Sequence, residues 1–193
     1  MYANQVPTET WRSACTIPRE LRLLRQGSTY RVASMPVFEL DKYSQRPIAY
    51  NYPDASNGIA IGEASASVLP CRIDLQMEMP QDSCSFSVYN ENDEEVKIGY
   101  IRKTDSFFID RSRSGKSYFH KEFAARHTAP RLTDNRQLSM TLLIDVASVE
   151  LFADGGLTTM TSVFFPTITF NKIRFQSDRS PVSIKYIPLK PLE

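Results

Sequence analysis

The stretch LSMTLLIDVASVELFADGG (residues 138–156) shows most clearly the pattern from which we predict the fold class of this chain. Its apolar side chains occupy every second position, at Leu138, Met140, Leu142 and Ile144 and again at Val149, Leu151 and Ala153. This period is typical of a β-strand with one buried face, because successive side chains point to opposite sides of a strand. The stretch runs into Asp-Gly-Gly, which supplies the positive φ angles of a tight turn. We therefore predict strands here and a hairpin turn over 152–158.

Four other stretches show the same two-residue period: CRIDLQMEM (71–79), SCSFSVY (83–89), TFNKIRFQS (169–177) and VSIKYIPL (182–189). YNENDEEV (89–96) is rich in Asn and Asp and predicts a second hairpin turn. No stretch of comparable quality has a helical period, and only MPVFELDKYS (35–44) is expected to form a short helical turn. Many short strands joined by turns predict an all-β fold, a two-sheet antiparallel β-sandwich.

Composition and charge exclude several classes of function. The 193 residues carry 23 basic and 22 acidic side chains, so neither nucleic acid nor an anionic membrane is an expected partner. The chain has no run of about 18 apolar residues that could span a bilayer, and its first ten residues lack the features of a signal peptide. Cys15, Cys71 and Cys84 have no metal-binding spacing and are interpreted as small buried hydrophobic residues. The residues alone therefore leave the localisation unknown.

The first third of the chain is organised differently. Alternating stretches near 10–17, 20–26 and 29–35 predict three strands, which are too few to enclose a core of their own. The segment YSQRPIAYNYPDASNG (43–58) contains Pro47, Pro53 and Gly58 and has little periodicity. We therefore predict an N-terminal piece (1–42), a linker (43–58) and the sandwich (59–193).

Five motifs, in this order, resemble glycoside hydrolase family 32, the family of levanases, inulinases and invertases. They are YANQVPTETWRSACTIPRELRL (2–23), PVFEL (36–40), FFIDRSRSG (107–115), AARHTAPR (124–131) and SVELFADGGLTTMTSVFFP (148–166). The first resembles the end of the family's five-bladed catalytic β-propeller, the second its exit segment, and the others its galectin-like C-terminal β-sandwich. The resemblance implies that residues 1–42 are a remnant of the last propeller blade. It also implies a larger parent enzyme, secreted or periplasmic.

The resemblance places the chemistry outside this chain. Family members carry their catalytic carboxylates in the motifs Asn-Asp-Pro-Asn-Gly, Arg-Asp-Pro and Glu-Cys, and none of these occurs here. We therefore predict no catalytic, cofactor-binding or metal-binding residues, and no activity of the chain alone. The expected function is that of a non-catalytic sandwich whose partner is the parent's propeller. The alternative is a lectin-like carbohydrate-binding module for fructans.

Glu150 and Asp154 are the carboxylates that most resemble an acid–base pair. In a strand, four positions correspond to about 13 Å, whereas retaining hydrolysis of a glycosidic bond needs two carboxyl groups about 5 Å apart. We therefore interpret Glu150 as a solvent-facing or interface residue and Asp154 as a turn residue.

Other polar groups are also given structural interpretations. Asp110, Arg111 and Arg113 form a charged cluster, in which one arginine is expected to pair with Glu150 or another acid. A sugar-binding arginine beside Asp110 is the alternative. His120 and His127 have no partner at a metal-ligand spacing.

Exposed aromatic rings would be needed for sugar stacking, and the candidates are Tyr89, Tyr100 and Tyr118. Most aromatic residues of a sandwich are expected to lie in the core. Phe107, Phe108, residues 138–144, Val149, Leu151 and residues 163–165 are predicted to fill it. Around Trp11, Ile17 and Leu23 we expect apolar surface and open strand edges, which favour self-association.

Overall fold

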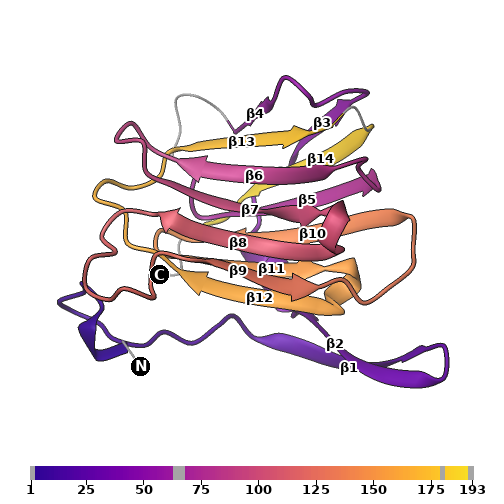
Figure 1. The fold of residues 1–193 in the computed structure, drawn as a ribbon, viewed down its shortest axis with the longest axis horizontal. Coiled ribbons are helices and arrows are strands. Elements are labelled where there is room, and N and C mark those ends of the chain that lie inside the picture. Colours follow the sequence, from indigo (N-terminus) through magenta and orange to yellow (C-terminus); the bar gives the residue numbers. More distant parts are fainter. Residues whose placement is uncertain (1–2, 63–67, 179–180, 191–193) are drawn as a thin grey trace.

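The computed structural model describes residues 3–62, 68–178 and 181–190, and it is built from two stacked six-stranded antiparallel sheets (Figure 1). The first sheet has the order β12-β11-β10-β5-β14-β3. Its strands are β3 (Ile48–Tyr52), β5 (Cys71–Glu78), β10 (Gln137–Ile144), β11 (Ser148–Ala153), β12 (Thr158–Val163) and β14 (Val182–Pro188). The all-β sandwich predicted from the alternating stretches is therefore confirmed.

The second sheet has the order β4-β13-β6-β7-β8-β9. Its strands are β4 (Ile59–Ile61), β6 (Ser83–Tyr89), β7 (Glu95–Ile101), β8 (Ser106–Arg113), β9 (Arg126–Pro130) and β13 (Lys172–Ser177). A separate hairpin of β1 (Arg19–Gln26) and β2 (Thr29–Pro36) lies beside the sandwich, at the lower edge of Figure 1. Four short 3₁₀ helices are described: η1 (Ala3–Gln5), η2 (Phe38–Tyr43), η3 (Arg102–Thr104) and η4 (Asp154–Gly156).

The core lies between the two sheets and is filled by the alternate side chains that the sequence singles out. Leu142 of β10 lies opposite Leu151 of β11, and both are fully buried. From the second sheet, the rings of Phe86 and Phe175 pack with their centroids 4.7 Å apart. Phe108 and Phe165 are also buried, but they lie outside this central cluster, and Val163 is only half-buried. The predicted core is thus confirmed at most of its positions.

The predicted turns are confirmed. The β6–β7 connection is a tight turn within 89–96, and η2 occupies most of the segment expected to form a helical turn. In η4, Asp154, Gly155 and Gly156 all have positive φ angles, of 48°, 68° and 83°. The Asp-Gly-Gly sequence favours this turn because glycine adopts positive φ at no steric cost, and Asp tolerates it better than most residues.

Two predictions about the first third are wrong. Residues 10–17 form no strand: no neighbouring chain pairs with them, and the N–H of Ile17 donates instead to the side chain of Glu150. The predicted linker contains β3, which pairs with β14 at the edge of the first sheet. Pro47 and Pro53 flank this strand and so leave its hydrogen bonds intact, since proline is tolerated outside the paired positions.

No helix among the described residues is both long and apolar enough to cross a membrane.

Candidate interface on the N-terminal hairpin

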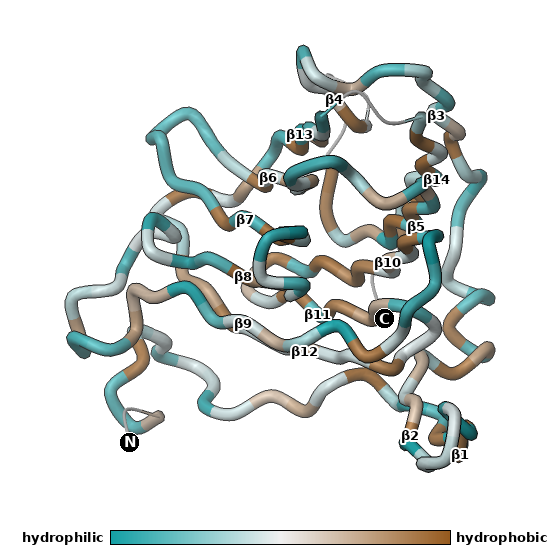
Figure 2. Tube along the Cα trace, turned by 45° about the vertical axis from the view of Figure 1, so that its right-hand side comes forward, coloured by the Kyte–Doolittle hydropathy of each residue, from teal (hydrophilic) through white to brown (hydrophobic). Residues whose placement is uncertain are grey.

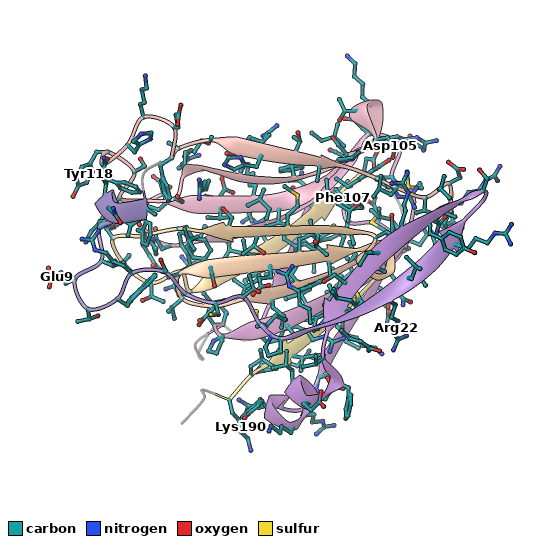
Figure 3. The ribbon with its side chains drawn as sticks, turned by 90° about the horizontal axis from the view of Figure 1, so that it is seen from below. Glu9, Arg22, Asp105, Phe107, Tyr118 and Lys190 are labelled. Atoms are coloured by element: carbon teal, nitrogen blue, oxygen red, sulfur yellow. The ribbon has the colours of Figure 1, made fainter. Side chains whose placement is uncertain are left out.

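The hairpin β1–β2 packs against the outer side of the first sheet through one of its two faces. It contacts η4 and β12, and in Figure 3, which views the molecule from below, it lies at the right-hand end of the sandwich. Ala33, on the inner face, is 3% exposed. The two backbones approach closely at Gly156, where a Cβ would lie 2.2 Å from the Ser34 carbonyl oxygen. A residue without a side chain is therefore required at this contact.

Gly156→Ala is expected to destabilise the chain by more than about 1 kcal/mol, because alanine suits neither the positive φ nor the space beside Ser34. Chemical denaturation would measure the loss, and proteolysis within 19–36 would report detachment of the hairpin. Gly155→Ala is the matched control, because it has a positive φ but no atom within 4 Å of its Cβ. Equal proteolysis of the two variants would contradict a packing role for Gly156.

Glu150 anchors the start of the hairpin to the sandwich. Its carboxylate, buried in β11, accepts hydrogen bonds from the backbone N–H of Ile17 (2.9 Å) and from the guanidinium of Arg19. The same guanidinium donates to Thr161 Oγ1 (2.9 Å) and lies 5.0 Å from the centre of the Phe152 ring. Charge-assisted bonds of this kind are among the stronger hydrogen bonds in proteins. Glu150 is thus an interface residue, in agreement with one of the two structural interpretations.

Neither Arg111 nor Arg113 pairs with Glu150, because both arginines belong to β8 of the other sheet, and the expected pairing with another acid is confirmed instead for Arg113. Arg111 is buried against Phe123, to whose carbonyl oxygen it donates (2.8 Å), and Arg113 lies 4.0 Å from Glu95. Asp110 instead pairs with Arg126 of the neighbouring strand, at 2.9 Å. The sequence pattern did not indicate Arg19 as the partner of Glu150, because the two residues are 131 positions apart.

Asp154 forms an ion pair with a different arginine, Arg131. Its Oδ2 accepts a 2.6 Å hydrogen bond from Arg131 Nε, and its Oδ1 accepts one from the Ser139 N–H at 3.3 Å. The side chains of Arg131 and Asp154 are 3% and 6% exposed. Burial raises the pKa of Asp154, although the guanidinium opposes the shift. Because Glu150 and Asp154 each bind a separate arginine, the structural interpretation of both carboxylates is confirmed.

The outer face of the hairpin is apolar and uncovered. Leu21 and Leu23 of β1 are each 66% exposed, and Tyr30 and Val32 of β2 are 64% and 58% exposed. Leu23 lies opposite Val32 in the ladder, so all four side chains share one face. Figure 2 shows apolar segments of this hairpin apart from the apolar interior of the sandwich. A group of four exposed apolar side chains on one face, beside the exposed Arg25, is typical of an interaction surface. The apolar surface expected around Leu23 is confirmed, and Trp11 is 40% exposed.

The three candidate tyrosines differ in accessibility. Tyr100 is fully buried, and its hydroxyl donates to Asp105 Oδ1 at 2.7 Å, so its proposed contact with a sugar is wrong. Tyr89 is half-buried in β6, between Lys172 and Arg174, whose charged groups lie 5.9 Å and 5.8 Å from its ring centre. Tyr118 is 85% exposed in the loop between β8 and β9 (Figure 3). A sugar contact at Tyr89 or Tyr118 stays a prediction.

The described residues include no group of three or more His, Cys, Asp or Glu side chains that could hold a metal ion. His120 Nδ1 accepts a hydrogen bond from the Glu122 N–H at 3.2 Å.

Burial raises the pKa of the Cys84 thiol to about 12, and Cys71 is buried too. Cys15 is exposed, because it lies in the extended N-terminal segment, so its interpretation as a buried residue is wrong.

Two facing antiparallel sheets with a hairpin packed on the outside of one define an all-β sandwich domain. The family described as glycosyl hydrolases family 32 C terminal matches residues 39–190. The chain therefore belongs to this family.

The chain covers only part of its relatives. It is 29% identical over 199 residues to a levanase of Bacillus subtilis, an alignment that covers 100% of this chain and 29% of the levanase. It is 26% identical over 171 residues to an extracellular exo-inulinase of Aspergillus niger, covering 86% of this chain and 32% of the inulinase.

The crystal structure of an exo-inulinase from Aspergillus awamori superimposes with a TM-score of 0.85 at 25% identity, over 98% of this chain and 38% of the inulinase chain. A fructofuranosidase from Schwanniomyces occidentalis, complexed with fructose, shares the fold with a TM-score of 0.80 at 19% identity, over 98% of this chain and 43% of the other. The chain thus spans less than half the length of these relatives.

Proposed function

We propose that this chain is a non-catalytic sandwich that supports the catalytic propeller of a fructan-hydrolysing glycosidase. The main support for the proposal is the exposure of four apolar side chains on the outer face of the hairpin: Leu21, Leu23, Tyr30 and Val32. The start of the same hairpin is fixed to the sandwich at Glu150, and its second strand packs on Gly156. A propeller seated on the outer face would cover the apolar patch, and its position would be coupled to the sandwich through these anchors.

The relatives support a fructan as the substrate of the parent enzyme. The matched proteins are a levanase and exo-inulinases, in which a region like this chain makes up about a third of the sequence. The sequence holds none of the three carboxylate motifs by which the family's propeller is recognised. We therefore assign fructan hydrolysis to the propeller of the parent enzyme and a supporting role to this chain.

A chimera tests the proposal. Residues 1–193 replace the aligned C-terminal region of the B. subtilis levanase, and the chimera is expected to hydrolyse levan and to unfold in one cooperative transition. Leu23→Lys should lower its free energy of unfolding by about 1.5–3 kcal/mol, the contribution of one buried leucine. In the isolated chain, the same change should have an effect within about 0.5 kcal/mol, because Leu23 is exposed there. Calorimetry measures both values.

Thr128→Lys is the matched control, since Thr128 is an exposed strand residue of β9 in the other sheet. It should leave both the chimera and the isolated chain unchanged. Release of fructose from levan by the purified chain alone would overturn the non-catalytic assignment. An equal effect of Leu23→Lys and Thr128→Lys in the chimera would overturn the hairpin as the docking face.

A further inference from the structure

A cavity of about 510 Å³ lies where the hairpin meets the end of the first sheet. Its walls come from β1, β5, the 133–139 segment and the η4 turn. The volume is within the range of about 300–1,000 Å³ that is usual for sites that bind small molecules. The cavity belongs to the inner side of the hairpin, as the inner-face residue Leu24 lines it.

The lining is rich in side-chain amides that are free to bind a ligand. Gln26, Gln76 and Gln137 all line the cavity, and in the part of the chain that is described their amide groups make no hydrogen bond. Asn135, beside them, uses its Oδ1 to accept the Gln137 N–H at 2.9 Å. Each amide offers both donors and an acceptor. This combination suits hydroxyl groups, which also donate and accept.

The charged groups at the cavity are already neutralised. Asp154 is the one carboxylate among the lining residues, and it is held by Arg131. Three further donors of that guanidinium bind the carbonyl oxygens of Thr133 (3.0 Å), Asn135 (2.7 Å) and Gln137 (3.0 Å). Because neither charge is available to a ligand, the cavity favours neutral polar molecules over cations or anions.

A neutral polar row continues from the cavity across the outer face of the first sheet. Ser139 of β10 pairs with Gln76 of β5, Gln76 pairs with Ser183 of β14, and Ser183 pairs with Asn51 of β3. Ser139, Gln76 and Ser183 lie on the outer face, because their neighbours along each strand point into the core, and Asn51 shares this face through its pairing with Ser183. With strands about 4.8 Å apart, the row is about 14 Å long, which is enough for several sugar rings.

We propose that the cavity and this row bind a neutral oligosaccharide. The amides of Gln26, Gln76 and Gln137 would hydrogen-bond sugar hydroxyls, and Leu24 and Leu157 would contact the apolar edge of a ring. The inference does not depend on docking of the propeller, because the site uses the inner side of the hairpin and the sheet beneath it.

Isothermal titration of the 193-residue chain tests the site with three probes: fructo-oligosaccharides from levan and inulin, maltopentaose, and an oligogalacturonate. Binding of a neutral probe tighter than about 10 mM is expected, with no binding of the anionic oligogalacturonate. Gln76→Ala and Gln137→Ala should each weaken binding by about tenfold, the effect of losing one hydrogen bond. Both residues are exposed, so the fold should persist, which the Tm would verify.

Gln176→Ala is the control, because Gln176 is a glutamine of β13 on the outer face of the other sheet. It should leave the affinity unchanged. A difference between fructo-oligosaccharides and maltopentaose would identify the preferred sugar. The proposed sugar site would be contradicted if neither neutral probe bound, or if the parent chain and the Gln76→Ala/Gln137→Ala double variant bound with equal affinity. Neither outcome would affect the result of the chimera experiment.

Discussion

Replacing Arg131 by alanine is expected to lower the free energy of unfolding by about 3–5 kcal/mol, because it leaves a buried carboxylate without its partner. The guanidinium is 3% exposed and binds Asp154 and three backbone carbonyl groups of the segment that leads into β10. Its removal takes away donors that water cannot replace without opening the segment. Urea denaturation monitored by fluorescence would measure the loss.

The pH dependence of this loss in the free energy of unfolding distinguishes loss of the ion pair from loss of side-chain packing alone. Burial raises the pKa of Asp154 even beside Arg131, and without the guanidinium this pKa should rise further. A folded-state pKa above the unfolded value, about 3.9, means that the folded state binds the proton more tightly. The destabilisation should therefore be smallest below about pH 4 and should grow as the pH rises and the carboxyl group ionises.

Arg113→Ala provides the control, since Arg113 is an exposed arginine 4.0 Å from Glu95. An exposed pair of this kind contributes at most about 1 kcal/mol. A loss at Arg131 as small as that at Arg113, or one that does not change with pH, would contradict the role assigned to the Arg131–Asp154 pair.

Leu151→Ala and Leu142→Ala are each expected to cost about 2–5 kcal/mol, because each creates a cavity in the core. Both leucines are fully buried and lie opposite each other in β11 and β10. Neighbouring truncations share one cavity, so the loss in the double variant should differ from the sum of the single losses by about 0.5–3 kcal/mol. Equilibrium unfolding of the three variants gives this coupling.

Leu21→Ala is the matched control on the hairpin, where the side chain is 66% exposed in the isolated chain. Its effect should stay within about 0.5 kcal/mol. If Leu21→Ala cost as much as Leu151→Ala, the outer face of the hairpin would have to be covered in solution, as it would be in a self-associated chain. Sedimentation at several concentrations would identify that case, and self-association stays a prediction until then.

Most of the sandwich could be predicted from local pattern. The alternation in residues 71–79 and 138–144 places Ile73, Leu75 and Leu142 on the buried face, as the structure has them. The same alternation wrongly predicted a strand at residues 10–17, which have no neighbouring strand to pair with. It also missed β3, because the prolines beside this short edge strand are typical of a linker as well as of a strand's ends.

The candidate sites were less predictable than the fold. The apolar face of the hairpin follows in part from the alternation around Leu23, but its pairing with Val32 and its exposure depend on how β1 and β2 pack. The cavity combines Gln26, Gln76 and Gln137 from three distant segments. No local signal distinguishes these glutamines from any other surface amides.

Local pattern accounts for the strands within 71–89 and 138–153, for the Asp-Gly-Gly turn and for the absence of the family's catalytic motifs, because each of these depends on neighbouring residues. Which arginine neutralises which carboxylate depends on long-range packing, since Arg19 and Glu150 are 131 residues apart and Arg131 and Asp154 are 23 residues apart. The tertiary structure also decided that Tyr100 is buried and Tyr118 exposed. Strand pairing and sheet packing set these distances and exposures, and a two-residue period contains no information about either.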